Sequence, residues 1–136
     1  MKKLLMVVMV MVVCASGAAP AFAIKQLSDQ FKVLYVGEKA TPEFKAAIEA
    51  AKCNICHVQD ENKKKVRNPY GNAVHEALEK DKFPIAEFKK EPAKFAERLT
   101  GILKKLEDVN SMDAEKRTFA ERMKADLSPG GDKDGK

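Results

Sequence analysis

The sequence predicts an all-α fold for the part of the chain that follows residue 23. After Pro92, apolar side chains recur at the three- and four-residue spacing of one helix face. Proline and capping residues stand where helices are expected to begin, as in Thr41-Pro42-Glu43. No segment shows a convincing alternation of apolar and polar residues, and the one strand candidate, residues 31–36, is equally compatible with a helical turn. These observations favour helices over strands.

Residues 1–23 have the pattern of a cleavable secretory signal peptide. A cationic start is followed by an unbroken apolar run over residues 4–13, and small residues then lead to the triplet Ala21-Phe22-Ala23. A membrane anchor is the alternative, but the run is well short of the roughly 20 residues that a spanning helix needs. We therefore expect cleavage after Ala23, export to the periplasm or the extracellular space, and no stable membrane span in the processed protein.

The processed chain has the size of one compact domain. Removing residues 1–23 from the 136 leaves 113. We expect the domain at residues 24–127 and a flexible, solvated tail at residues 128–136, which begin with the helix-stopping sequence Ser-Pro-Gly-Gly. The formal charge falls from +5 to +3 because Lys2 and Lys3 leave with the signal peptide. A nucleic-acid binder would be more strongly basic, so we expect no nucleic-acid partner.

The first two expected helices flank a pair of cysteines. Thr41 is the predicted N-cap of a helix that has Pro42 at its first position and runs through alanine-rich sequence to Lys52, directly before Cys53. A second helix is expected to start near Gly71 or Asn72 and to end at about residue 80, with its apolar side chains on one face.

The clearest helix follows Pro92, which suits a first helical turn, as does Pro84 before it. A last helix is expected with Ser111 as its N-cap and with Phe119, Met123 and Leu127 along one face. The apolar positions that predict the helix after Pro92 are Phe95, Leu99, Ile102, Leu103 and Leu106.

The cysteines carry the strongest functional signal. The processed chain keeps only Cys53 and Cys56, and both lie in a Cys-x-x-Cys-His sequence that ends at His57. This is the pattern of covalent haem attachment. Two thiols at this spacing can add to the two vinyl groups on one edge of the porphyrin, and the next residue then carries an imidazole for the iron. The sequence therefore predicts one haem held at Cys53 and Cys56, with His57 as the proximal iron ligand.

Other interpretations of the motif fit less well. A disulfide or a thioredoxin-like redox site would leave His57 unexplained, and no βαβ pattern surrounds the cysteines. Structural zinc usually takes four nitrogen or sulfur ligands. The processed chain offers only Cys53, Cys56, His57 and the distant His75, and His57 directly follows a cysteine, which is an awkward geometry for zinc.

The motif and its position early in the processed chain resemble the small single-haem, class I-like c-type cytochromes, in which attachment follows the first helix. In the cytochrome c′ type of four-helix bundle the motif instead lies near the C-terminus. The resemblance implies a cytochrome c-like helical domain wrapped around one covalently bound haem c, which carries electrons and is not an enzyme. It also implies that the first and last helices cross through aromatic packing, for which Phe44 and Phe119 are the matching residues.

In this family the sixth iron ligand is commonly a downstream methionine followed by proline, and this sequence departs from that pattern. Neither Met112 nor Met123 precedes proline. Met112, at the expected start of the last helix, is our first choice for a distal ligand. Met123 shares a helix face with Phe119 and favours the core, and His75 favours a solvent-facing position. A water-filled or empty sixth position is the remaining alternative.

The predicted function is the transfer of single electrons between redox partner proteins. A basic run at residues 63–65, with Arg67 shortly after it, favours an acidic partner, although a solvated loop is the simpler interpretation. Arg67 and Tyr70 are candidates for a hydrogen bond to a haem propionate, a contact that the sequence alone does not show. The alternative functions are binding or sensing of a small ligand at an open iron position, and, further away, haem-free thiol redox chemistry.

Overall fold

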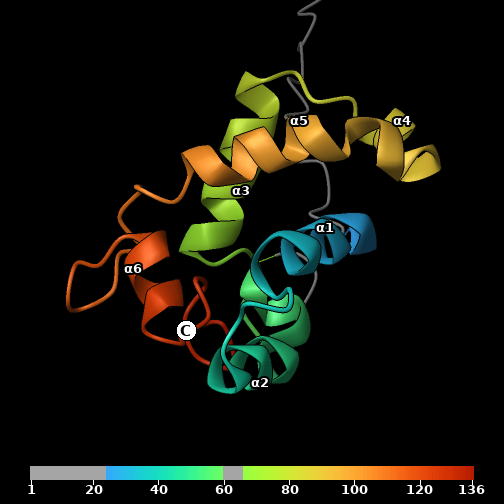
Figure 1. The fold of residues 1–136 in the computed structure, drawn as a ribbon. Helices are drawn as coiled ribbons and strands as arrows, with labels where there is room; N and C mark the ends of the chain where they lie inside the picture. The colour runs from blue at the N-terminus through green and yellow to red at the C-terminus, as the bar shows by residue number, and fades with distance from the viewer. Residues whose placement is uncertain (1–23, 60–65) are drawn as a thin grey trace, which may run out of the picture.

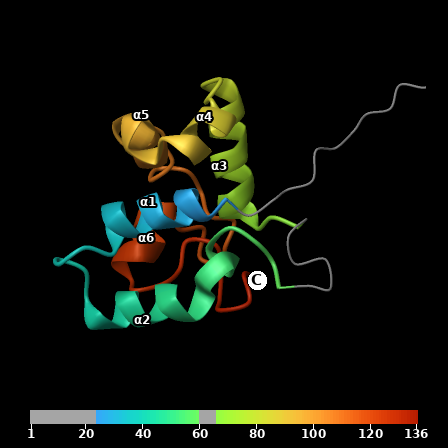
Figure 2. The same ribbon diagram turned by 90° about the vertical axis from the view of Figure 1, so that its right-hand side faces the viewer.

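A computed structural model describes residues 24–59 and 66–136 (Figures 1 and 2), and these ranges contain helices and no strand. The all-α prediction is confirmed for them. The predicted signal peptide and the basic run at residues 63–65 lie outside the described residues. The helices are α1 (Lys25–Tyr35), α2 (Pro42–Ala51), the short 3₁₀ helix η1 (Lys52–Ile55), α3 (Pro69–Lys80), α4 (Ile85–Lys90), α5 (Pro92–Lys105) and α6 (Phe119–Lys124).

The N-termini of α2 and α3 are fixed by the same kind of cap. The Thr41 hydroxyl accepts a hydrogen bond from Phe44 N at 3.1 Å, and Pro42 takes the first helical position, as predicted. In α3 the Asn68 carboxamide oxygen accepts from Gly71 N at 2.9 Å. The helix therefore begins at Pro69, slightly before the position that its apolar pattern indicates.

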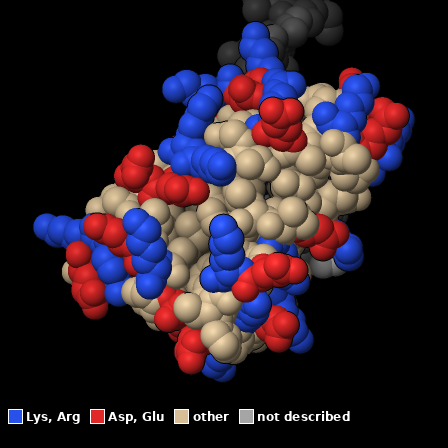
Figure 3. Space-filling model, in the orientation of Figure 1, with Lys and Arg blue, Asp and Glu red and all other residues tan. Residues whose placement is uncertain are grey.

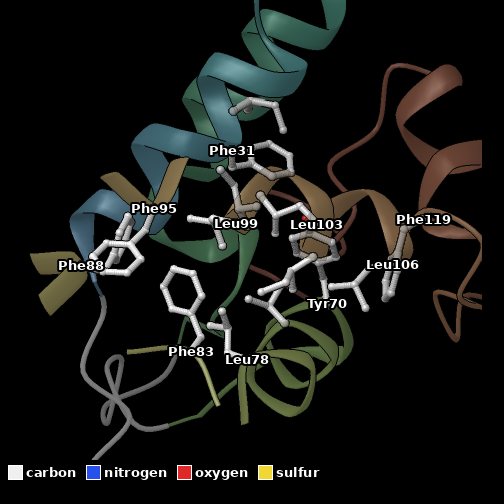
Figure 4. Packing of buried hydrophobic residues seen from close by; sticks show 14 of the residues in the cluster. Phe31, Tyr70, Leu78, Phe83, Phe88, Phe95, Leu99, Leu103, Leu106 and Phe119 are labelled. Atoms are coloured by element: carbon white, nitrogen blue, oxygen red, sulfur yellow. The ribbon is translucent and has the colours of Figure 1, made fainter. Parts of the chain in front are cut away.

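The core forms where α5 packs against α1, α3 and α4. All five apolar positions predicted for one face of α5 are buried, and Leu99 is completely buried. Phe31 is also buried, within α1, so the strand candidate that begins there is helical up to Tyr35. Figure 4 shows two aromatic groups joined by Leu99 and Leu103. One group contains Phe83, Phe88 and Phe95, and the other contains Phe31, Tyr70 and Phe119.

The predicted start of the last helix at Ser111 is wrong. Helix α6 begins at Phe119, because Thr118 and Glu121 form a reciprocal capping box. Before it, Met112 and Lys116 adopt the left-handed backbone conformation, which does not continue a right-handed helix. Ser111 instead donates its amide to Arg117 O at 2.8 Å within a closed loop.

The predicted solvated tail is also wrong. After α6 the chain turns back, and Ser128, Pro129 and Gly130 are buried. Gly135 is buried as well, against the backbone of His57. Because glycine has no side chain, the backbone of this segment can contact other backbone closely. The segment therefore packs against the domain, although its composition is typical of a mobile chain end.

No helix in residues 24–59 or 66–136 has the length and apolar character needed to cross a membrane.

Replacing Leu99 by alanine tests whether this side chain is packed in the core. The side chain is completely buried, so the substitution is expected to lower the free energy of unfolding by about 2–5 kcal/mol. Val33→Ala is the control, because that side chain is 73% exposed and its loss should change stability by less than about 0.5 kcal/mol. Urea unfolding followed by circular dichroism measures both. Equal effects of the two substitutions would contradict the packing described here.

Candidate functional site around Cys53, Cys56 and His57

The motif lies in a tight turn that ends α2. Lys52 has a positive φ of 50°, a backbone conformation that does not continue the α-helix. It is the first residue of η1, after which the amides of Cys56 and His57 both donate to Cys53 O, at 3.3 and 3.1 Å. The turn places the two thiols and the imidazole on one short, hydrogen-bonded segment.

The two thiols are free and differ in their surroundings. Cys53 is exposed, whereas Cys56 is half-buried. Burial, reinforced by the nearby Cys53, raises the pKa of the Cys56 thiol to about 12, against a smaller opposing effect of Arg67. Catalytic thiols have lowered pKa values and often lie at helix N-termini, whereas these cysteines follow the C-terminal end of α2. Burial therefore disfavours the thiolate form of Cys56.

The His57 ring is oriented by a backbone carbonyl. Its Nδ1 lies 3.2 Å from Val66 O, and since a carbonyl only accepts, Nδ1 is the donor. Val58 N donates to the same carbonyl at 3.1 Å, and His57 pairs with Arg67 in an isolated antiparallel bridge. Burial lowers the pKa of His57 despite the bond to Val66, so the neutral ring is favoured. A neutral imidazole with Nδ1 protonated keeps its Nε2 lone pair for a metal.

Asn68 is the functional residue that sequence reasoning missed. Its side chain is buried, with 1% of the residue exposed, and the two hydrogens of its carboxamide nitrogen are shared among three carbonyls of the motif. These are Asn54 O at 2.9 Å, Ile55 O at 3.1 Å and His57 O at 3.4 Å. The backbone amide of Asn68 donates to the remaining carbonyl, Cys56 O, at 3.0 Å. In the sequence, Asn68 before Pro69 signals a turn and a helix cap, but nothing local indicates the motif as its partner.

Three glycines let other segments approach the motif closely, and a Cβ atom at one of them, Gly130, would lie 2.1 Å from Ile55 O. A Cβ atom at Gly71 would lie 1.9 Å from Cys56 O, and one at Gly135 would lie 2.0 Å from His57 O. Gly135 also has a φ of 75°, a conformation that side chains disfavour. The first turn of α3 and the C-terminal end of the chain therefore both contact the motif backbone directly.

Tyr70 and Phe119 pack next to each other within the core. Their ring centroids are 4.9 Å apart at a steep angle, and Tyr70 also contacts Phe31 at 5.8 Å (Figure 4). Phe44 and Phe119 are both buried, but among the described residues the aromatic partner of Phe119 is Tyr70. The Tyr70 hydroxyl has no hydrogen-bond partner among the described residues. Burial is the main reason that its pKa is raised, and nearby ionisable groups raise it further. The bond from Tyr70 to a haem propionate stays a prediction.

The three distal-ligand candidates lie in different surroundings. Met112 is on the loop between α5 and α6 and is 78% exposed. The Nε2 atom of His75 lies 3.4 Å from a Glu79 carboxylate oxygen on α3, and Met123 packs against the hydrophobic core. All three assignments stay predictions.

Residues 24–59 and 66–136 contain no group of three or more His, Cys, Asp and Glu side chains arranged to hold a metal ion. On the face shown in Figure 3, basic and acidic side chains are interspersed, with no single-sign patch dominating.

No family model matches the sequence, and comparison with curated proteins and with solved structures finds no match either.

Replacing Asn68 by alanine removes both the α3 cap and the donor shared by three motif carbonyls. Buried carbonyls left unpaired and a lost cap together are expected to lower the free energy of unfolding by at least about 2 kcal/mol. Asn72→Ala is the matched control, because Asn72 is exposed one turn further along α3. Thermal unfolding of both variants measures the difference, and an Asn68→Ala variant as stable as the control would refute the role given to this side chain.

Proposed function

We propose that the protein is an exported, single-haem c-type cytochrome that carries electrons between redox partners. The observation that carries the proposal is the donor set of the motif. It combines two free thiols at haem-attachment spacing with a buried imidazole whose Nδ1 is held by Val66 O. The residues fit the group, since neutral imidazole with a free Nε2 is what an iron ligand requires.

The chain's residues would divide the work of binding haem c. Each thiol would add across one vinyl group, with its sulfur bonding one vinyl carbon and its proton passing to the other. His57 would supply Nε2 to the iron, and the bond to Val66 O would hold the ring in place. When bound, haem iron supplies a one-electron couple between its ferric and ferrous states.

The motif's rigidity and exposure suit an electron carrier. Asn68 pairs with all four carbonyls from Asn54 to His57, so the ligand-bearing turn has little freedom to rearrange. Cys53 is exposed, so a haem attached there would be accessible to a partner protein. An acidic partner and an exported location are parts of the proposal that rest on the sequence, through the basic run and the N-terminal segment.

A second candidate function is binding of a small ligand at an open iron position. The surroundings of the distal candidates favour it: His75 is beside Glu79, Met123 packs against the core and Met112 is on an exposed loop. Carbon monoxide binding to the reduced protein separates the two functions, because a firmly held sixth ligand in a carrier resists displacement.

Replacing Cys53 and Cys56 together by serine tests the attachment site. Produced in a host that matures c-type cytochromes, the unaltered protein is expected to give a red band that stains for haem on a denaturing gel, and the double variant none. Cys14→Ser is the control, since Cys14 lies within the predicted signal peptide and its loss should leave the band unchanged. A colourless unaltered protein whose mass equals that of the bare processed chain would overturn the proposal.

Replacing Met112 by alanine tests the distal ligand. If Met112 binds iron, the oxidised protein has the weak long-wavelength absorption band of sulfur coordination, and the variant lacks it. The variant should also bind carbon monoxide about tenfold more tightly, the equivalent of 1.4 kcal/mol. Met123→Ala is the control and should retain the band. Identical spectra for the unaltered protein and Met112→Ala would exclude Met112 as the ligand.

A further inference from the structure

The chain's last nine residues, 128–136, form a segment that we name the C-terminal strap. It follows α6 and returns toward α2, so that its end lies close to the motif in space (Figures 1 and 2). Asp126, in the turn before the strap, has a φ of 60°. Its carboxylate accepts a hydrogen bond from the Thr41 hydroxyl at the start of α2. The strap's origin is therefore tied to the helix that leads into the motif.

A buried ionic network anchors the first part of the strap. The Arg122 guanidinium donates to Ser128 O and to Gly131 O, both at 3.0 Å, and to the Asp113 carboxylate at 3.0 Å. The side chains of Arg122 and Asp113 are only 10% and 12% exposed. Although burial alone would raise the pKa of Asp113, hydrogen bonds from Arg117 and Arg122 outweigh it and hold the pKa at about 2. The anchor thus stays ionised at neutral pH.

The second part of the strap is a closed turn. One oxygen of the Asp132 carboxylate accepts from the amides of Asp134 and Lys136, at 2.8 and 3.0 Å, and Asp132 N donates to Lys136 O at 2.9 Å. The hydrogen bonds from the backbone amides of Lys136 and Asp134 lower the pKa of the Asp132 carboxyl. Hydrogen bonds within the turn give this end of the chain a defined shape.

The strap contacts the motif on both sides of His57 in the sequence. Before it, the Asn54 carboxamide donates to Lys133 O at 2.9 Å, and after it, Gln59 N donates to Asp134 O at 2.7 Å. Gly135 lies directly against His57 O, where there is no space for a Cβ atom. The strap thereby restrains the main chain that carries the imidazole, while Val66 restrains the ring.

We propose that the C-terminal strap is a positioning element for His57, which sets the orientation of the imidazole by fixing the backbone from Asn54 to Gln59. The effect on an iron ligand rests on the proposed function. The positioning of the ring does not, because the contacts belong to the chain itself. A strap lifted from the motif leaves His57 O without its close neighbour and removes the acceptor of Gln59 N.

Replacing Gly135 by alanine tests this proposal in the full chain. The new Cβ would meet His57 O, so the strap must lift. Gly101→Ala is the matched control, since a Cβ there has open space on an exposed face of α5. Asp132→Ala opens the strap's turn without adding bulk, and serves as a second variant if Gly135→Ala fails to fold.

The first measurement uses the processed chain without haem. Hydrogen exchange at the Gln59 amide is expected to accelerate at least about tenfold in both strap variants, the equivalent of 1.4 kcal/mol, and to stay unchanged in Gly101→Ala. Nitrogen chemical shifts of His57 are expected to report Nδ1 protonated in the unaltered chain and a mixture of tautomers in the strap variants. Unchanged Gln59 exchange, or faster exchange with an unaltered His57 signature, would overturn the positioning role.

The second measurement uses the haem-loaded protein. The reduction potential of both strap variants is expected to differ from that of the unaltered protein, whereas Gly101→Ala is expected to match it. Equal potentials in all four proteins would overturn the effect on the iron ligand. If the unaltered protein itself takes up no haem, the proposed function fails, and the exchange and nitrogen-shift measurements still decide whether the strap positions His57.

Discussion

Four consecutive carbonyls, from Asn54 to His57, lie in a turn where regular helical bonding has ended, and each needs a donor because the turn is packed against other backbone. Asn68 supplies the donors for all four: its backbone amide bonds Cys56 O, and the two hydrogens of its carboxamide are shared among the other three carbonyls. The carboxamide oxygen meanwhile caps α3. One buried side chain therefore fixes the cysteine motif to the start of a helix, and the rest of the site depends on that connection.

The connection extends from the motif into the core. Because Asn68 sets the first turn of α3, it also places Tyr70 between Phe31 of α1 and Phe119 of α6. Helix α5 closes the other side of this aromatic group through Leu99 and Leu103 (Figure 4). Movement of the motif would thus disturb packing between helices that are far apart in the sequence. A small domain with a modest core gains rigidity by sharing residues between its site and its interior in this way.

The elements that the sequence predicted well are those encoded by short-range patterns. The buried face of α5 follows from apolar spacing, and the start of α2 follows from Thr41 and Pro42. The loop before α6 was mispredicted because Ser111 resembles a cap locally, whereas the capping box at Thr118 sets the true start. The strap and Asn68 were missed for a related reason. Their roles depend on partners about ten to eighty residues away, and glycine-rich or polar sequence gives no sign of such contacts.

The unequal burial of the two motif cysteines makes them chemically distinct in the folded chain. Cys53 faces solvent, while Cys56 is half-buried with a pKa raised to about 12 by burial, so at neutral pH its thiolate is scarce. An alkylating reagent added to the folded chain with free thiols would accordingly modify one sulfur well before the other. Labelling kinetics at Cys56 then become a measure of how often the turn opens, and a single-site adduct at Cys53 becomes a practical way to mark the folded chain.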